Sequence, residues 1–213
     1  NSPNTFTIFC RNPSKLPPHI HSLSQPSSSS SSSPAKIQII TGEFTDLSAL
    51  TRALHTGATI LISFAGPAIP AKGTAITEFY KTLFPLIKQD SQTRISRVLV
   101  LSTPSFRVVE DKFSLKWWLG VQFVYWLFGD AWEEVNGIGK VVTGLRDEEE
   151  DKLEWTVFRV PGLTKAAAGP VRAGFIGERG DGLLLSRKSL AVWILQEVEE
   201  RKWVGRCPAL SDA

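Results

Sequence analysis

Five short runs of apolar and β-branched residues are spaced along the chain, and segments of helical periodicity separate most of them. The runs predict β-strands at 6–10, 37–40, 59–63, 97–101 and 155–160. Each run is hydrophobic on both faces, which is typical of a parallel sheet covered by helices on both sides. Strands that alternate with helices indicate an α/β protein.

Three helices are predicted from capping residues and apolar spacing. The first follows the N-cap residue Asp46 and ends near His55, and the second covers residues 74–89 with Pro85 inside it. The third begins behind Ser186, and its Leu190, Trp193, Ile194 and Val198 fall at helical spacing. That spacing predicts a face that packs on the core.

Length and composition suit one domain over residues 1–213, because 42% of the residues are hydrophobic and can form a sizeable core. The serine tract at 22–34 cannot bury apolar surface, and we expect a flexible surface insertion there.

Charge, cysteines and hydropathy exclude several classes of partner. The 24 basic and 21 acidic residues are scattered along the chain, which is unlike a nucleic-acid-binding surface. Neither Cys10 nor Cys207 has metal-ligand spacing and there are only three histidines, so we expect no metal and a reduced, cytoplasmic setting. No apolar run reaches the roughly 18 residues of a membrane span.

Small and polar residues follow each predicted strand, where open parallel sheets bind their ligands. After the five strands come Arg11-Asn12-Pro13, Thr41-Gly42-Glu43-Phe44, Phe64-Ala65-Gly66-Pro67, Ser102-Thr103-Pro104 and Pro161-Gly162-Leu163. Arg11 offers a bidentate clamp for phosphate, and Glu43 can accept a hydrogen bond from an amine. One such turn is ordinary, but five in a row predict a ligand-binding edge.

The stretches RNPSKL, ITGEFTDLSALTRAL, ILISFAGP, RVLVLSTPS, LEWTVFRVPGLT, LSRKSLAVWILQEVEE and RKWVGRCPALS carry a resemblance over nearly the whole chain. The sequence resembles the atypical short-chain dehydrogenase/reductases of the NAD(P)H-binding, NmrA-like group. The resemblance implies a Rossmann-like, doubly wound parallel sheet that binds NADP(H), with NAD the less favoured cofactor.

The resemblance also implies roles for the residues at the strand ends. Arg11 would hold the 2′-phosphate, Glu43 and Phe44 would flank the adenine, and Ala65 and Gly66 would lie along the cofactor. Pro161, Gly162 and Leu163 would border the nicotinamide. The implied cofactor-binding set is completed by the neighbouring Asn12, Gly42, Phe64, Leu101 and Val160.

Members of this group begin with one more strand, a glycine-rich loop and a helix, and RNPSKL follows that unit. Nothing precedes residue 1 in this sequence. The resemblance therefore implies a Rossmann-like fold truncated at its N-terminus, with its central strand missing.

Catalysis is the second departure from the wider superfamily, whose enzymes use a serine, a tyrosine and a lysine. Only Tyr80 and Tyr125 exist, and neither stands four residues before a lysine. Trp132 stands where the resemblance would put the tyrosine, and Lys140 is eight residues on. The remaining catalytic candidates are Ser102, Thr103 and Lys140.

The stretch KWWLGVQFVYWLFG, residues 116–129, is unusually aromatic. It can be a buried helix, a lid over an apolar substrate or a membrane-surface patch, and we favour the buried helix. An apolar pocket is expected from residues 104–129 and the segment after Gly162.

These features favour a reductase-like protein that takes a small apolar acceptor. The alternatives are a non-catalytic redox sensor of the NmrA type, which binds dinucleotide and a protein partner, and an inactive fragment. The missing tyrosine favours the sensor, whereas the aromatic pocket favours the enzyme.

Overall fold

The computed structural model describes residues 4–24, 35–67, 72–147 and 153–213. Their contacts divide the chain into two compact units. The first unit comprises Asn1–Ile60 and Thr82–Ile95, and the second comprises Leu61–Lys81 and Ser96–Ala213.

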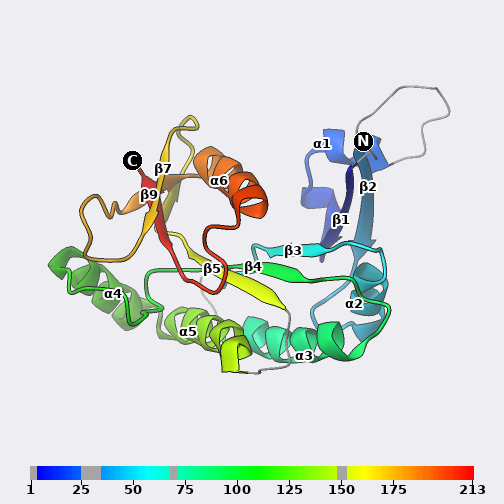
Figure 1. The fold of residues 1–213 in the computed structure, drawn as a ribbon, viewed down its shortest axis with the longest axis horizontal. Helices are drawn as coiled ribbons and strands as arrows, with labels where there is room; N and C mark the ends of the chain where they lie inside the picture. The colour runs from blue at the N-terminus through cyan, green and yellow to red at the C-terminus, as the bar shows by residue number, and fades with distance from the viewer. Residues whose placement is uncertain (1–3, 25–34, 68–71, 148–152) are drawn as a thin grey trace. The chain divides into compact units, whose positions relative to one another are not determined.

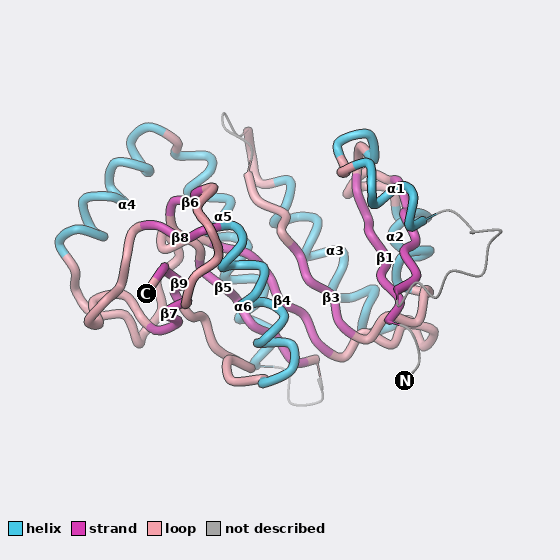
Figure 2. The backbone as a smooth tube through the Cα atoms, turned by 90° about the horizontal axis from the view of Figure 1, so that it is seen from above, coloured by secondary structure: helices cyan, strands magenta, loops and turns pink. Residues whose placement is uncertain are grey.

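The first unit contains a two-stranded parallel sheet of β1 (Asn4–Cys10) and β2 (Ala35–Thr41). The 3-10 helix η1 (Pro13–Lys15) and α1 (Pro18–Ser24) connect the two strands, and α2 (Leu47–Leu54) follows β2 and contacts both of them (Figure 2). The Asp46 carboxylate accepts a hydrogen bond from the backbone N–H of Ala49, so it caps α2 as its sequence position predicted.

The second unit is built on a five-stranded sheet in the order β3-β4-β5-β9-β7. Its strands are β3 (Ile60–Ser63), β4 (Arg97–Ser102), β5 (Glu154–Arg159), β9 (Ala209–Asp212) and β7 (Val171–Gly174). β4, β5 and β9 are parallel, and β7 is antiparallel to β9. A separate pair is formed by β6 (Gly162–Thr164) and β8 (Leu184–Ser186).

Two helices cover the two faces of this sheet, as Figure 1 shows. α5 (Gly129–Thr143) contacts β4 and β5, and it runs on into the 3-10 helix η2 (Gly144–Asp147). On the other face α6 (Arg187–Glu200) places Trp193 with its ring centroid 6.3 Å from that of Phe158 on β5. The β4 and β5 residues Val98, Leu99, Val100, Val157 and Phe158 are fully buried between these layers.

Two further helices complete the fold. α3 (Ala75–Gln89) contains Pro85, and α4 (Leu115–Leu127) contacts α5. The arrangement is the α/β Rossmann-like fold with a mostly parallel sheet that the sequence predicted.

All five predicted strands and all three predicted helices are confirmed to within a few residues. The Ser186 hydroxyl accepts a hydrogen bond from the backbone N–H of Lys188 and so caps α6. Residues 22–24 of the predicted flexible insertion end α1, and residues 25–34 lie outside the described residues. The single-domain assignment and the N-terminal truncation remain predictions.

The prediction of a buried helix at residues 116–129 is wrong. Within α4 only Trp117 is buried, at 8% exposure. An apolar helix is usually buried, but its sequence does not show whether the same chain or another molecule buries it. In α4 the described chain covers one stripe only.

Candidate functional site

The carboxyl ends of β1 and β2 bring three predicted cofactor residues together in the first unit. The Arg11 guanidinium carbon lies 6.0 Å from the centroid of the Phe44 ring, and Arg11 Nε lies 4.0 Å from Glu43 Oε2. The side chains of Arg11 and Glu43 are largely exposed. A cation, an aromatic face and a carboxylate therefore stand at one edge, where a phosphate, a planar base and its amine could each find a partner.

The two neighbouring cofactor candidates of the first unit have clear local roles. The side-chain oxygen of Asn12 accepts hydrogen bonds from the Ser14 N–H at 3.0 Å and the Ser14 hydroxyl at 2.6 Å, which caps η1. A Cβ on Gly42 would lie 2.5 Å from the Ala49 Cβ and 3.0 Å from the Phe9 ring. Gly42 is thus required by the close approach of α2 to the end of β2.

The end of β3, in the second unit, carries three of the predicted cofactor residues. Phe64 is exposed and forms an edge-to-face ring contact with Phe158, with centroids 5.8 Å apart. The Ala65 N–H donates to Ser63 Oγ at 3.4 Å, and Gly66 is exposed. A Cβ on Gly66 would lie 3.4 Å from a Leu101 methyl, so these two candidates are adjacent.

Ser63, the last residue of β3, is a further candidate that the sequence analysis did not name. The buried Tyr80 hydroxyl donates to Ser63 Oγ at 2.6 Å, and burial raises the pKa of this phenol despite that bond. Tyr80 therefore stays protonated at neutral pH and holds the serine in place. With two donors directed at its oxygen, Ser63 has its own O–H to offer at the strand end. The sequence could have indicated Ser63, because this residue stands at the end of the predicted strand, directly before Phe64 in ILISFAGP.

The ends of β4 and β5 meet through a backbone bond, because the Val160 N–H donates to the Ser102 carbonyl at 2.9 Å. Pro161 follows, and Gly162 and Leu163 belong to β6, where they pair with Leu184 and Leu185 of β8. The structure therefore joins the backbone of Ser102 to that of Val160, which directly precedes the predicted nicotinamide-side residues.

The three catalytic candidates differ in their surroundings. Ser102 is fully buried, and its hydroxyl donates to the Val135 carbonyl of α5 at 3.2 Å. Thr103 is half-buried, and its hydroxyl accepts from the Ser105 N–H at 3.3 Å. Lys140 is exposed on α5, whose buried face carries Val135 and Ile138. The structure does not bring Lys140 to the two hydroxyls.

Trp132 lies on α5, and its ring packs edge-to-face on Tyr125 of α4, with centroids 5.1 Å apart. The indole therefore helps to attach α4 to α5. It has no titratable proton for acid–base chemistry.

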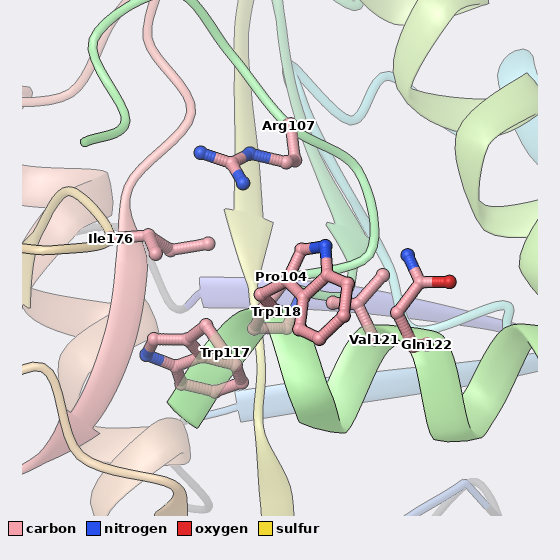
Figure 3. Close-up of a pocket in the computed structure, with 7 residues that line it drawn as sticks. All are labelled: Pro104, Arg107, Trp117, Trp118, Val121, Gln122 and Ile176. Carbon is pink, nitrogen blue, oxygen red and sulfur yellow. The ribbon is translucent and has the colours of Figure 1, made fainter. Parts of the chain in front are cut away.

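A small pocket of about 70 Å³ lies in the region that the sequence predicted for the substrate (Figure 3). Its lining consists of Pro104, Arg107, Trp117, Trp118, Val121, Gln122 and Ile176. The walls are mainly apolar, and Figure 3 shows the Arg107 guanidinium and the Gln122 amide as polar groups beside it. Ligand pockets usually reach roughly 300–1,000 Å³, so this one has room for only part of a ligand.

A buried ion pair that the sequence did not suggest supports the pocket wall. Arg159, at the end of β5, pairs with Asp111 and also donates to the Phe106 carbonyl at 3.0 Å. Asp111 in turn accepts from the Val108 N–H and the Ile176 N–H, each at 3.0 Å. The pair thus ties the loop after β4 to the segment that carries Ile176.

Two features are absent from the described residues, a membrane-spanning helix and a cluster of metal ligands. No helix in the described part of the chain is long and apolar enough to cross a membrane. Over the same residues, no group of three or more histidine, cysteine, aspartate or glutamate side chains is placed to hold a metal ion.

The fold is that of a Rossmann-like α/β protein with a mostly parallel sheet. The chain belongs to the NAD(P)H-binding family, whose sequence model matches residues 3–201. No curated protein matches the chain in sequence.

Several solved structures share the fold. A short-chain dehydrogenase/reductase from Veillonella parvula DSM 2008 in complex with NADP has a TM-score of 0.68 at 13% identity, over 97% of this chain and 82% of that one. ChuY, an anaerobillin reductase from Escherichia coli O157:H7, has a TM-score of 0.59 at 18% identity, over 83% of this chain and 75% of that one. The oxidoreductase ylbE from Lactococcus lactis has a TM-score of 0.59 at 13% identity, over 84% of this chain and 73% of that one. At these identities the similarity concerns the fold.

Proposed function

We propose that this protein binds NADP(H) in preference to NAD(H) and reduces a small apolar acceptor in the cytoplasm. The observation that carries the proposal is the grouping of Arg11, Glu43 and Phe44 at the ends of β1 and β2. Family membership supports a nicotinamide cofactor, and Arg11 supports the phosphorylated form.

The preference rests on charge. A guanidinium pairs with a phosphate through charge-assisted hydrogen bonds that contribute about 1.5–3 kcal/mol each. Arg11 is exposed and lies near one carboxylate, that of Glu43, at 4.0 Å. A 2′-phosphate adds two or more acceptor oxygens for the same guanidinium, whereas the 2′-hydroxyl of NADH offers one uncharged partner.

The bound cofactor would supply a hydride, and the chain's own residues would orient the acceptor. Thr103, half-buried after β4, can donate a hydrogen bond that polarises a carbonyl. Ser102 would act indirectly, because its hydroxyl is bonded to α5 and holds the end of β4 in place. With Trp132 in place of a tyrosine, water would deliver the proton.

The pocket beside α4 supports an apolar acceptor. Trp118, Pro104, Val121 and Ile176 offer apolar walls, and Arg107 can pair with an acidic substituent. We therefore expect an acceptor with one flat apolar end and favour acceptors that carry a carboxylate.

Calorimetry with NADPH and NADH tests the cofactor proposal. We expect tighter binding of NADPH, and we expect Arg11→Ala to erase most of the difference. Arg52→Ala is the matched control, because Arg52 is another exposed arginine of the first unit and lies on α2. Equal affinity of the parent protein for both cofactors would contradict the assignment to NADP.

A second candidate function is a redox sensor that binds dinucleotide and a protein partner without catalysis, as NmrA-type regulators do. It is favoured by the exposed position of Lys140 and by the bond that the Ser102 hydroxyl already makes to Val135. NADPH oxidation with quinones, flavins, small aldehydes and anaerobillin separates the two functions. Cofactor binding without turnover of any acceptor supports the sensor.

A further inference from the structure

α4 exposes a large apolar face that the rest of the described chain does not cover. Leu115, Leu119, Phe123 and Trp126 recur at intervals of three or four residues and therefore share one side of the helix. Phe123 is 61% exposed and Trp126 is 81% exposed. Other exposed large apolar side chains in and just before α4 are Phe113, two residues before the helix, and Trp118, Tyr125 and Leu127 within it.

Such a face is unusual for a free surface. Monomeric proteins scatter single apolar residues over their surface, whereas several large apolar side chains exposed side by side mark an interaction site. The opposite stripe, with buried Trp117 and half-buried Val121 and Val124, already packs on the second unit. The exposed side is therefore available to an external partner.

We propose that α4 docks this protein onto the surface of a membrane that contains anionic lipids. Residues 112–129 include Lys112 and Lys116 and contain no acidic residue. Lys112 is exposed at the N-terminal approach to the helix, and Lys116 is partly exposed while it pairs with Asp181. Cations beside an apolar face match a lipid surface with negative headgroups.

The chemistry of the exposed side chains also suits lipid. Tryptophan and tyrosine carry a polar handle on an apolar ring, and they concentrate where hydrocarbon meets headgroups. The face offers few hydrogen-bonding groups beyond Gln122 and these rings, whereas a protein interface carries about one hydrogen bond per 100–200 Å². At 13 residues α4 is shorter than the roughly 20 needed to span a bilayer, so it would lie in the interface.

Vesicle flotation with the full chain tests the proposal. The vesicles contain phosphatidylcholine alone, or phosphatidylcholine and phosphatidylglycerol at a ratio of about 3:1. We expect the protein to float with the anionic vesicles and to bind the neutral ones less, with added salt narrowing the difference. Failure to float with either vesicle would overturn the proposal.

Substitutions identify the surface. Phe123→Ser with Trp126→Ser removes two exposed rings that do not line the pocket, and we expect binding to anionic vesicles to fall by at least about tenfold. Val192→Ser with Leu195→Ser removes two exposed apolar side chains of α6 and should change binding less than about twofold. Lys112→Glu should weaken binding to anionic vesicles by about fivefold or more and leave binding to neutral vesicles unchanged.

Two other occupants of the face give different results. If a second copy covers α4, light scattering shows a dimer that the Phe123→Ser/Trp126→Ser variant dissociates. If α4 is a substrate lid, that variant changes the KM of an accepted acceptor while vesicle binding is absent from the parent as well. Either result would overturn the proposal.

Discussion

Arg159 and Asp111 form a bidentate ion pair whose two side chains are both fully buried. Arg159 Nη1 lies 2.6 Å from Asp111 Oδ2, and Arg159 Nη2 lies 2.8 Å from Asp111 Oδ1. Arg159 also donates to two backbone carbonyls, that of Cys207 at 2.8 Å from Nε and that of Phe106 at 3.0 Å from Nη1. Desolvation of both charges is offset because the polar atoms of the pair find partners.

Breaking this pair is expected to be costly. Asp111→Asn keeps the shape but leaves the Arg159 charge uncompensated in the core, which should lower the free energy of unfolding by about 3–5 kcal/mol. All seven tryptophans lie in the second unit, so tryptophan fluorescence during urea unfolding reports on that unit. Glu78→Gln, in the exposed pair with Lys81, is the control and should cost less than about 1 kcal/mol. A loss for Asp111→Asn no larger than for the control would show that the pair is dispensable.

Two helical glycines should respond in opposite ways to alanine. A Cβ on Gly139 of α5 would lie 2.4 Å from the Phe106 ring, so Gly139→Ala should destabilise the second unit by about 1–3 kcal/mol. A Cβ on Gly120 of α4 would meet no atom within 4 Å, so Gly120→Ala should add up to about 1 kcal/mol through helix propensity. Urea unfolding measures both, and the same sign for both variants would contradict the packing of Phe106 on α5.

Substitutions of Ser102, the last residue of β4, and of Thr103, which follows it, are expected to affect different properties, stability in the first case and turnover in the second. Ser102→Ala removes the hydrogen bond to Val135 and should lower the free energy of unfolding by about 1 kcal/mol with little effect on kcat. Thr103→Val should lower kcat on an accepted acceptor by about 10²-fold if its hydroxyl stabilises the developing oxyanion. Trp132→Phe should leave turnover within a few-fold. Unchanged NADPH oxidation in Thr103→Val would remove Thr103 from the mechanism.

The Lys116–Asp181 pair should add a pH dependence to the stability of the second unit. Burial acts to raise the pKa of Asp181, but the hydrogen bond from Lys116 Nζ at 2.5 Å and the Gly177 N–H outweigh it, and the pKa is lowered overall. The contribution is therefore fully present above the pKa of the unfolded aspartate, about 3.9, and is lost as the pH falls through the lower folded pKa.

Urea midpoints between pH 7 and pH 2 test this dependence. Asp181→Asn should be less stable than the parent at pH 7, and the gap should close in strong acid, where the parent carboxylate is protonated as well. A constant gap over the whole range would show that the substitution acts through packing alone.

Much of the framework was predictable from local sequence. The five principal strands are runs of apolar, β-branched residues, and Asp46 and Ser186 cap the helices that follow them. Strands β6, β7, β8 and β9 were missed because they have only three or four residues each and gain their stability from partners distant in the chain. Strand β3 is equally short, but its ILIS run is apolar, whereas β6 (GLT), β7 (VRAG), β8 (LLS) and β9 (ALSD) contain no such apolar, β-branched run.

The sequence by itself determined the Rossmann-like framework and the strand-end positions of Arg11, Glu43, Phe44 and Thr103, because strand and helix patterns are local and each of these residues follows the end of a strand. The tertiary structure alone decided which polar groups are already bonded. In the folded chain the Ser102 hydroxyl donates a hydrogen bond to the Val135 carbonyl, and Arg159 forms a buried ion pair with Asp111. It also left the apolar face of α4 exposed. Burial and pairing depend on which segments, distant in the chain, come into contact, and the type of a residue does not specify those contacts.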